Sequence, residues 1–188
     1  MLFSISQQCF RLEVTAEFTA VSSPKISGES LVLQLREVTA ADLDVFFTFQ
    51  QDPDATRMAA FAANNPSDRA VFDHYWQALL NDERVTARTM DLDGRPIGSV
   101  AALPNSGDAG FELVFWTDKE YWHKGLTSQA VQQFVAEFDK RPLYARAVVD
   151  NVGSLKILES AGFEKVGCEP GFSNVRQEVV DERILKLS

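Results

Sequence analysis

The chain has 188 residues, 45% of them apolar and 24% charged, and its 27 acidic side chains exceed the 18 basic ones, giving a net charge of −9. That length is typical of one compact domain with a short extension, and it allows a hydrophobic core without disulfides or metal. The negative charge argues against sequence-independent binding to DNA or RNA, which needs clustered cations facing phosphate.

The cysteines, the histidines and the short apolar runs argue against several further classes of protein. Cys9 and Cys168 lie far apart and, with His74 and His123, lack the spacing of a metal site, so we expect no metal. No apolar run reaches the roughly 18–20 residues of a membrane helix. The first residues do not resemble a secretory signal, and the chain has only two cysteines, so we expect a reduced, cytoplasmic protein with no membrane partner. Cys168 lies on a late expected strand, and we expect it in the core.

Residues 1–29 differ in pattern from the rest of the chain. They alternate loosely between apolar and polar up to Ala20, and then run through Ser-, Pro- and Gly-containing stretches typical of a linker. We therefore expect an N-terminal extension over residues 1–29 and one domain over residues 30–188. The extension is an extra edge strand, a disordered tail or an over-long start, and its pattern does not separate the three.

The first part of the domain predicts a strand followed by two helices. Residues 31–38 alternate with a period of two, which indicates a strand. Thr39 and Asp42 have the spacing of a capping box, which predicts a helix that ends at Asp52-Pro53. A second helix is expected over residues 67–80, where apolar residues have helical spacing.

The remaining elements change from a meander to α-connected strands. Asp93-Gly94 is a strong hairpin signal between the first two strands of the meander. The resulting order, β-α-α-β-β-β-α-β-α-β-β, predicts a mixed α/β domain with a central sheet. The expected strands are residues 84–92, 96–103, 110–117, 143–149, 163–167 and 178–187, and the expected helices are residues 125–140 and 151–161.

Two segments carry candidate chemistry. At Gly125 a strand–loop passes into a helix, whose first amides point outward and carry partial positive charge. Gly125 has no Cβ to block a ligand, and Lys119 and Lys124 add cations, so this junction suits a phosphate or pyrophosphate. The plain alternative is an ordinary strand–loop–helix with a glycine turn. In the second segment, Asn151 and Ser154 either cap a helix or line the same cleft.

Together these segments resemble the GNAT superfamily of N-acetyltransferases, and within it the RimJ/RimL branch of ribosomal-protein alanine N-acetyltransferases. The resemblance covers residues 31–187. It rests on four segments: LVLQLREVTAADLD, FELVFWTDKEYWHKGLTSQAV, DNVGSLKILESAGFEKVG and VDERILKL. It implies the GNAT acyl-CoA N-acyltransferase fold, with a mixed α/β sheet of about seven strands flanked by about four helices.

The phosphate loop departs from the family pattern. The superfamily loop is Gln/Arg-x-x-Gly-x-Gly/Ala, and its central glycine is kept here as Gly125. Trp122 replaces the leading Gln/Arg, and Thr127 replaces the final small residue. The tyrosine that many members carry is Leu158 here, so the resemblance assigns the proton donor for the leaving thiolate to Ser154.

The resemblance implies acetyl transfer from acetyl-CoA to a primary amine within a ternary complex. Pantetheine would lie along the strand at residues 114–116 as an added strand, and the pyrophosphate would bind the amides of residues 124–127. The implied cofactor-binding residues are Val114, Phe115, Trp116, Lys119, His123, Lys124, Gly125, Leu126, Thr127, Asn151 and Ser154.

A protonated amine must lose its proton before it attacks, which calls for a general base. Glu112, on the same strand, is the first candidate, against the strong alternative of a sheet residue that is solvated or paired with a neighbouring Arg. His74, near the acceptor side in this family, is the second, against the alternative of an ordinary helix residue. The acceptor is a protein N-terminus or a small amine, and the protein a monomer or homodimer. The alternative function is a non-catalytic acyl-CoA-binding or protein-interaction module.

Overall fold

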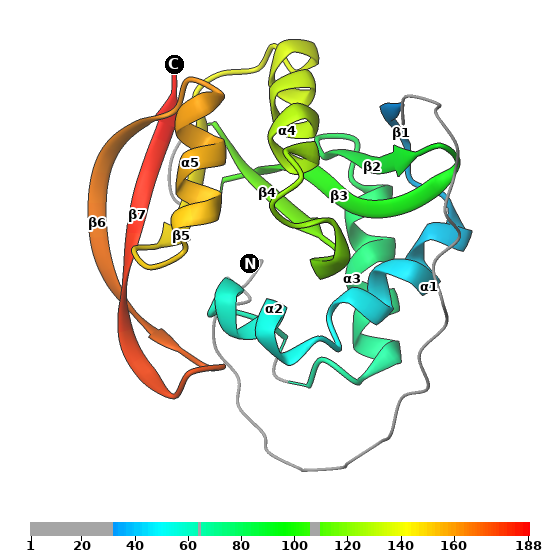
Figure 1. The fold of residues 1–188 in the computed structure, drawn as a ribbon, viewed down its shortest axis with the longest axis horizontal. Coiled ribbons are helices and arrows are strands. Elements are labelled where there is room, and N and C mark those ends of the chain that lie inside the picture. The colour runs from blue at the N-terminus through cyan, green and yellow to red at the C-terminus, as the bar shows by residue number, and fades with distance from the viewer. Residues whose placement is uncertain (1–31, 64, 106–109) are drawn as a thin grey trace.

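The computed structural model describes residues 32–63, 65–105 and 110–188. Across them runs one seven-stranded mixed sheet, ordered β1-β2-β3-β4-β5-β7-β6 and accompanied by five α-helices (Figure 1). The extension at residues 1–29 lies outside the described residues. The strands are β1 Leu33–Glu37, β2 Thr86–Leu92, β3 Arg95–Pro104, β4 Phe111–Thr117, β5 Leu143–Val148, β6 Glu164–Ser173 and β7 Glu178–Leu187; the helices are α1 Ala40–Phe49, α2 Pro53–Ala59, α3 Arg69–Asn81, α4 Leu126–Glu137 and α5 Val152–Ser160.

β2, β3 and β4 form an antiparallel meander, as the sequence predicts, and β1 pairs antiparallel with β2. Asp93 and Gly94 both have positive φ, at 51° and 82°, which is the conformation that a tight two-residue hairpin turn requires. β4 and β5 then run parallel, joined through α4, and β7 pairs antiparallel with both β5 and β6. The predicted mixed α/β fold class is confirmed.

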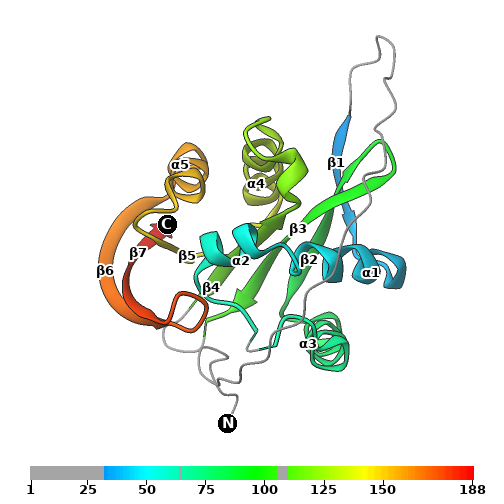
Figure 2. The same ribbon diagram turned by 60° about the horizontal axis from the view of Figure 1, so that its bottom comes forward.

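The helices cover both faces of the sheet. α4 and α5 lie on one face and α1 and α3 on the other, as Figure 2 shows. Each face has its own apolar cluster. The α4/α5 face buries Phe134, Leu143, Leu158 and Leu185, among others, whereas the α1/α3 face buries Phe46, Phe72, Trp76 and Ala101. No helix in the described ranges is long and apolar enough to cross a membrane.

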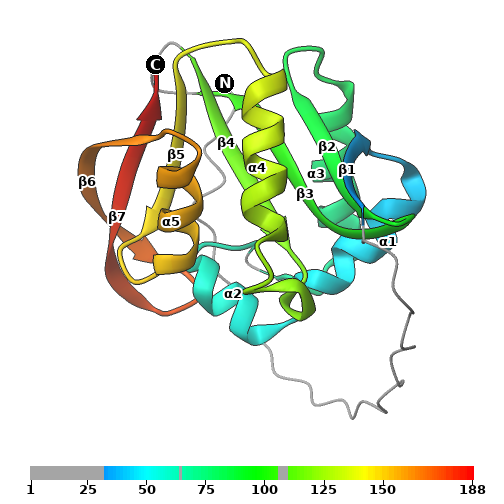
Figure 3. The same cartoon turned by 45° about the horizontal axis from the view of Figure 1, so that its top comes forward.

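The structure adds a helix that the sequence pattern did not predict. Asp52 does not end the helical region; its side chain accepts hydrogen bonds from the amides of Asp54 and Ala55 and so begins α2, with Pro53 in the first turn. The described residues therefore contain five α-helices, one more than the expected number. α2 lies across the sheet at the end where β4 and β5 separate (Figure 3).

The edge strand β6 also differs from expectation. It extends to Ser173 and not to Gly167, and most of its residues are exposed because its outer edge has no strand partner among the described residues. Cys168 is consequently an exposed free thiol, and the expectation that it lies in the core is wrong.

Candidate functional site

The site is built on a break in the pairing of two parallel strands. β4 and β5 pair only at Phe111 with Leu143 and at Glu112 with Tyr144, whereas each strand continues for several residues beyond that point. From there the two strands diverge toward their carboxyl ends (Figure 3). The edge of β4 that faces β5 therefore has backbone groups available to a ligand.

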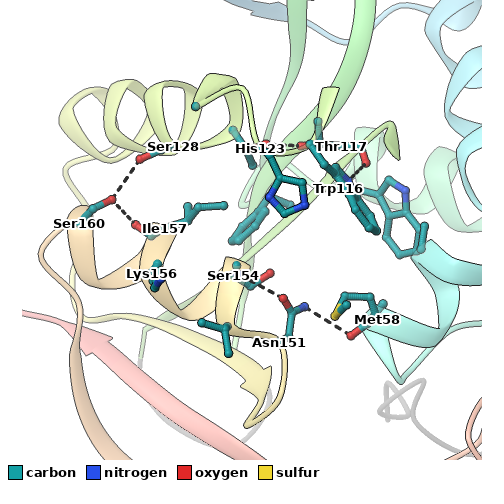
Figure 4. A pocket seen from close by; sticks show the side chains of 18 of the residues that line it. Met58, Trp116, Thr117, His123, Ser128, Asn151, Ser154, Lys156, Ile157 and Ser160 are labelled. Atoms are coloured by element: carbon teal, nitrogen blue, oxygen red, sulfur yellow. Dashed lines mark hydrogen bonds between the residues drawn. The ribbon is translucent and has the colours of Figure 1, made fainter. Parts of the chain in front are cut away.

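A cavity of about 760 Å³ lies at these diverging ends, between α2, the loop before α4, and α5. Its walls are mainly apolar, with polar groups from the two helix amino termini (Figure 4). A cavity of this size and character is typical of a small-molecule or cofactor site. The lining residues are Ala55, Met58, Ala59, Phe115, Trp116, Thr117, Trp122, His123, Gly125, Thr127, Ser128, Asp150, Asn151, Val152, Gly153, Ser154, Lys156, Ile157 and Ser160.

The loop before α4 contributes His123 and Gly125 to the lining of this cavity. Gly125 is the N-cap residue of α4 and adopts φ 77°, and His123 adopts φ 60° although it is not glycine. A Cβ at Gly125 would meet no atom within 4 Å, so the space beside its backbone is open. Since no side chain caps the amino terminus of α4, its first amides can bind an anion.

The two departures from the family loop make contacts with the end of β4. The indole Nε1 of Trp122 donates to the carbonyl of Thr117 at 3.0 Å, which holds the loop against the strand. The hydroxyls of Thr127 and Thr117 are 2.9 Å apart and share a hydrogen bond. Thr127 is therefore accommodated by a partner in β4.

The opposite wall comes from the first turn of α5. The Asn151 side chain accepts a hydrogen bond from the Ser154 amide at 3.1 Å, so it is a helix cap, and it also donates to the Met58 carbonyl of α2 at 3.4 Å. Both Asn151 and Ser154 line the cavity, so the cap and the cleft are one structure (Figure 4). The His123 imidazole projects into the cavity between α4 and α5 in the same view.

The predicted cofactor residues divide into two groups. Lys119 forms ion pairs with Asp54 and, at 3.6 Å, with Asp52 of the α2 cap, so its charge is used within the protein. The Lys124 ammonium lies 5.0 Å from the ring centre of Tyr121. Seven predicted residues line the cavity, namely Phe115, Trp116, His123, Gly125, Thr127, Asn151 and Ser154, whereas Val114, Lys119, Lys124 and Leu126 do not.

The two candidate bases lie outside the cavity lining. Glu112 is at the last position of β4 that pairs with β5, with Tyr75 and Arg146 as electrostatic neighbours. Burial raises the pKa of Glu112, and the positive charge of Arg146 acts in the opposite direction. Burial also raises the pKa of Tyr75, with a further contribution from Glu112. His74 is exposed on α3.

Sequence reasoning missed the α2 wall of the cavity. Ala55, Met58 and Ala59 come from α2, which the sequence analysis does not predict because it ends the first helix at Asp52-Pro53 and assigns no element to the residues that follow. A signal was present, because Asp52-Pro53 matches a capping residue followed by proline in the first turn.

A family model described as an acetyltransferase (GNAT) domain matches residues 33–164. The chain belongs to this GNAT family. The match covers β1 through the start of β6 and includes the phosphate-binding loop candidate and the first turn of α5. The family that the sequence motifs suggested is thereby confirmed.

Solved structures share the GNAT fold at low sequence identity. A spermidine N-acetyltransferase from Vibrio cholerae in complex with CoA and spermine has a TM-score of 0.71 at 14% identity, covering 82% of this chain and 94% of that chain. The ribosomal-protein-alanine N-acetyltransferase of Brucella melitensis gives 0.70 at 17% identity, with 82% and 98% covered. RimJ of Mycobacterium smegmatis in complex with CoA-disulfide gives 0.68 at 15% identity, with 82% and 81% covered.

These neighbours include members of the expected RimJ/RimL branch and an enzyme from outside it. Two of them carry RimJ or ribosomal-protein alanine acetyltransferase names, and one acts on spermidine. The RimJ/RimL branch therefore stays a prediction. A sequence comparison with curated proteins gives no match.

Proposed function

We propose that this GNAT domain transfers an acetyl group from acetyl-CoA to a primary amine by direct attack in a ternary complex. The observation that carries the proposal is the cavity at the diverging ends of β4 and β5, closed at one end by the uncapped amino terminus of α4. The family match supports the reaction class, and two of the solved neighbours are complexes that contain CoA or a CoA disulfide.

The residues of this chain fit the parts of acetyl-CoA. The open backbone at Gly125 and the amides of residues 124–127 would hold the pyrophosphate. The edge of β4 at residues 114–116 would pair with the pantetheine amides. His123 would add a polar contact from within the cavity. Bound acetyl-CoA supplies the activated thioester.

The protein's own part in the reaction is to place two reactants and manage one proton. Holding both reactants in one orientation supplies several kcal/mol of the barrier by making attack effectively unimolecular. A backbone N–H of β4 near Val114 would polarise the thioester carbonyl. Glu112 would accept the amine proton, directly or through water, and the Ser154 hydroxyl would donate to the departing thiolate.

The acceptor is proposed only as a primary amine, on a protein N-terminus or a small molecule. The solved neighbours include both kinds, a spermidine N-acetyltransferase bound to spermine and a ribosomal-protein-alanine N-acetyltransferase. The cytoplasmic location and a monomeric or homodimeric state likewise stay predictions from the sequence.

The first test is isothermal titration of the protein with acetyl-CoA, using two variants at Gly125. Gly125→Glu and Gly125→Gln add side chains of similar size at the same positive φ, but only the glutamate adds negative charge to the anion site. We expect saturable binding by the natural chain, weaker binding by Gly125→Gln because of backbone strain, and no measurable binding by Gly125→Glu.

If the two variants bound acetyl-CoA with equal affinity, the anion site would not lie at this loop. If the folded natural chain did not bind acetyl-CoA, the proposal of acetyl-CoA as the donor would be overturned. An amine-dependent assay of CoA thiol release then separates the enzyme from the alternative. Acetyl-CoA binding without thiol release across peptide and small-amine acceptors would favour a non-catalytic acyl-CoA-binding module.

A further inference from the structure

One wall of the cavity is α2, a short helix whose own residues stabilise it only weakly. α2 has seven residues and contributes Ala55, Met58 and Ala59 to the lining. An isolated helix of that length is not stable in water. Its C-cap, Ala60, is fully buried and has a left-handed φ of 65°, which an alanine adopts at a cost. The position of this wall therefore depends on contacts with other elements.

Lys119 pairs with Asp52 and Asp54 at the start of α2, and the contacts at the other end of α2 come from the C-terminal part of the chain. The last carbonyls of a helix have no partner within it, and here each of three receives a side-chain donor. Arg176 Nε donates to the Arg57 carbonyl at 2.9 Å, Asn151 donates to the Met58 carbonyl, and the Ser173 hydroxyl donates to the Ala60 carbonyl.

Arg176 connects three elements at once. From the β6–β7 turn its two terminal nitrogens bind both carboxylate oxygens of Asp150 at 2.6 and 3.1 Å, while its Nε binds α2. The Arg176 side chain is only 8% exposed. Asp150 lies at the β5–α5 junction and lines the cavity, and its pKa is lowered by the hydrogen bonds from Arg176. A planar guanidinium supplies this fork, and a lysine ammonium does not.

We propose that Arg176 is a positioning residue for the acetyl-CoA cavity: by joining Asp150 to the end of α2, it fixes the α2 wall at the distance that the bound acyl-CoA requires. Arg176 lies outside the matched residues 33–164, so the proposal concerns a feature of this chain that the family match does not include. It rests on the proposed function for the identity of the ligand, but not for the contact itself.

The test compares Arg176→Met with Lys165→Met in two measurements. Lys165 is on the same hairpin and forms an ion pair with Glu159 of α5 at 2.8 Å, and neither residue lines the cavity. Hydrogen–deuterium exchange without ligand should show α2 amides exchanging about tenfold faster in Arg176→Met, and unchanged in Lys165→Met. Titration should show acetyl-CoA binding weakened about tenfold in Arg176→Met only.

Steady-state kinetics supply a readout that a general loss of stability would not give. We expect Arg176→Met to raise KM for acetyl-CoA about tenfold while kcat stays within about threefold, because the reacting groups are unchanged. If Arg176→Met does not fold, Arg176→Gln, which lacks the charged fork, is measured in the same way with the same expected direction.

The proposal would be overturned if folded Arg176→Met had the same α2 exchange rates as the unchanged chain, or the same affinity for acetyl-CoA. The exchange experiment also separates this proposal from the proposed function. If the natural chain binds no acetyl-CoA, the donor assignment fails, whereas faster exchange in α2 would still establish the contact made by Arg176.

Discussion

Glu112 is the first candidate for the general base, and its surroundings alter its basicity. It lies at the vertex from which β4 and β5 diverge, and burial raises its pKa while Arg146 limits the rise. An ordinary surface glutamate is too weak a base to take a proton efficiently from an ammonium ion. Burial makes the carboxylate a stronger base than it would be at an exposed position, and the positive charge of Arg146 favours its ionised form.

We expect Glu112→Gln to lower kcat about 100-fold or more, because the amide cannot accept the amine proton, and to leave the Kd for acetyl-CoA nearly unchanged. The measurement is kcat against pH with one fixed amine. Glu164→Gln, at an exposed position on β6, is the matched control and should retain natural kcat at every pH. A kcat in Glu112→Gln close to that of the natural chain would remove Glu112 from the chemistry.

A substitution at Arg146 tests whether Glu112 is the base, because it should shift the pKa of Glu112 in a known direction. The positive charge of Arg146 lowers the pKa of Glu112, so Arg146→Met should raise that pKa further. If Glu112 is the base, the acidic limb of the kcat profile then moves to higher pH, since activity needs the ionised carboxylate. A limb that stays in place would assign it to another group.

At the scale of elements, the sequence predicted those whose signals are local. The Thr39–Asp42 box is present, with the Thr39 amide donating to Asp42 Oδ2 at 2.8 Å, and the hairpin turn at Asp93-Gly94 is present too. The Gly125 loop and the Asn151 cap were found for the same reason, because each is encoded within a few residues.

α2 and its role were not predicted because distant residues hold them. The partners of its terminal carbonyls are 93 to 119 residues away in the chain, and no local pattern shows them. The pairing of Lys119 with Asp54 is also long-range, so a cation expected at the phosphate loop serves instead to attach α2. Sequence reasoning therefore found the two helix amino termini of the site and missed the wall between them.

α1 is attached to the sheet through a charged network that makes stability depend on pH. Arg36 of β1 binds both carboxylate oxygens of the buried Asp42 at 2.6 and 2.7 Å, and also binds Asp91 of β2 at 2.7 Å. Burial would raise the pKa of Asp42, but hydrogen bonds from Arg36, Thr39 and Thr89 outweigh it and lower that pKa from 3.8 to about 2.

Because the folded pKa lies below the unfolded one, the ionised carboxylate stabilises the fold above about pH 4, by about 2 kcal/mol, and this is lost as pH falls toward 2. Asp42→Asn leaves Arg36 without its main partner and should cost about 3 kcal/mol, or about 6–12 °C in midpoint, at pH 7. Thermal unfolding from pH 7 to pH 2 is the measurement.

The difference between the natural chain and Asp42→Asn should shrink as pH falls. Asp73→Asn is the control, because Asp73 pairs with Arg69 on an exposed helix surface, where ion pairs contribute little. A constant difference at all pH values would mean that packing, and not the charge of Asp42, holds α1.

For the whole molecule, the placement of the cavity follows from the sheet. Strands β1 to β4 pair in series, and so do β5, β7 and β6. Among the described strands, the two groups pair with each other at only two positions of β4 and β5. The molecule therefore has two halves of one sheet with a ligand-sized gap at their junction. α2 and α5 connect across that gap, so ligand binding there should stabilise the junction of the halves.

The boundary between residues 1–29 and the domain at residues 30–188 can be tested by shortening the chain. Sheet pairing begins at Leu33, and the described core clusters cover both faces of the sheet, so residues 30–188 should fold without residues 1–29. We expect the shortened chain to unfold in one transition within about 2 °C of the full chain, and to bind acetyl-CoA within about twofold. A midpoint lower by more than about 5 °C would correspond to more than 1 kcal/mol contributed by the extension, which would favour an extra edge strand over a tail. Natural stability with weakened acetyl-CoA binding would instead assign the extension to the ligand site, because only the bound state would then depend on it.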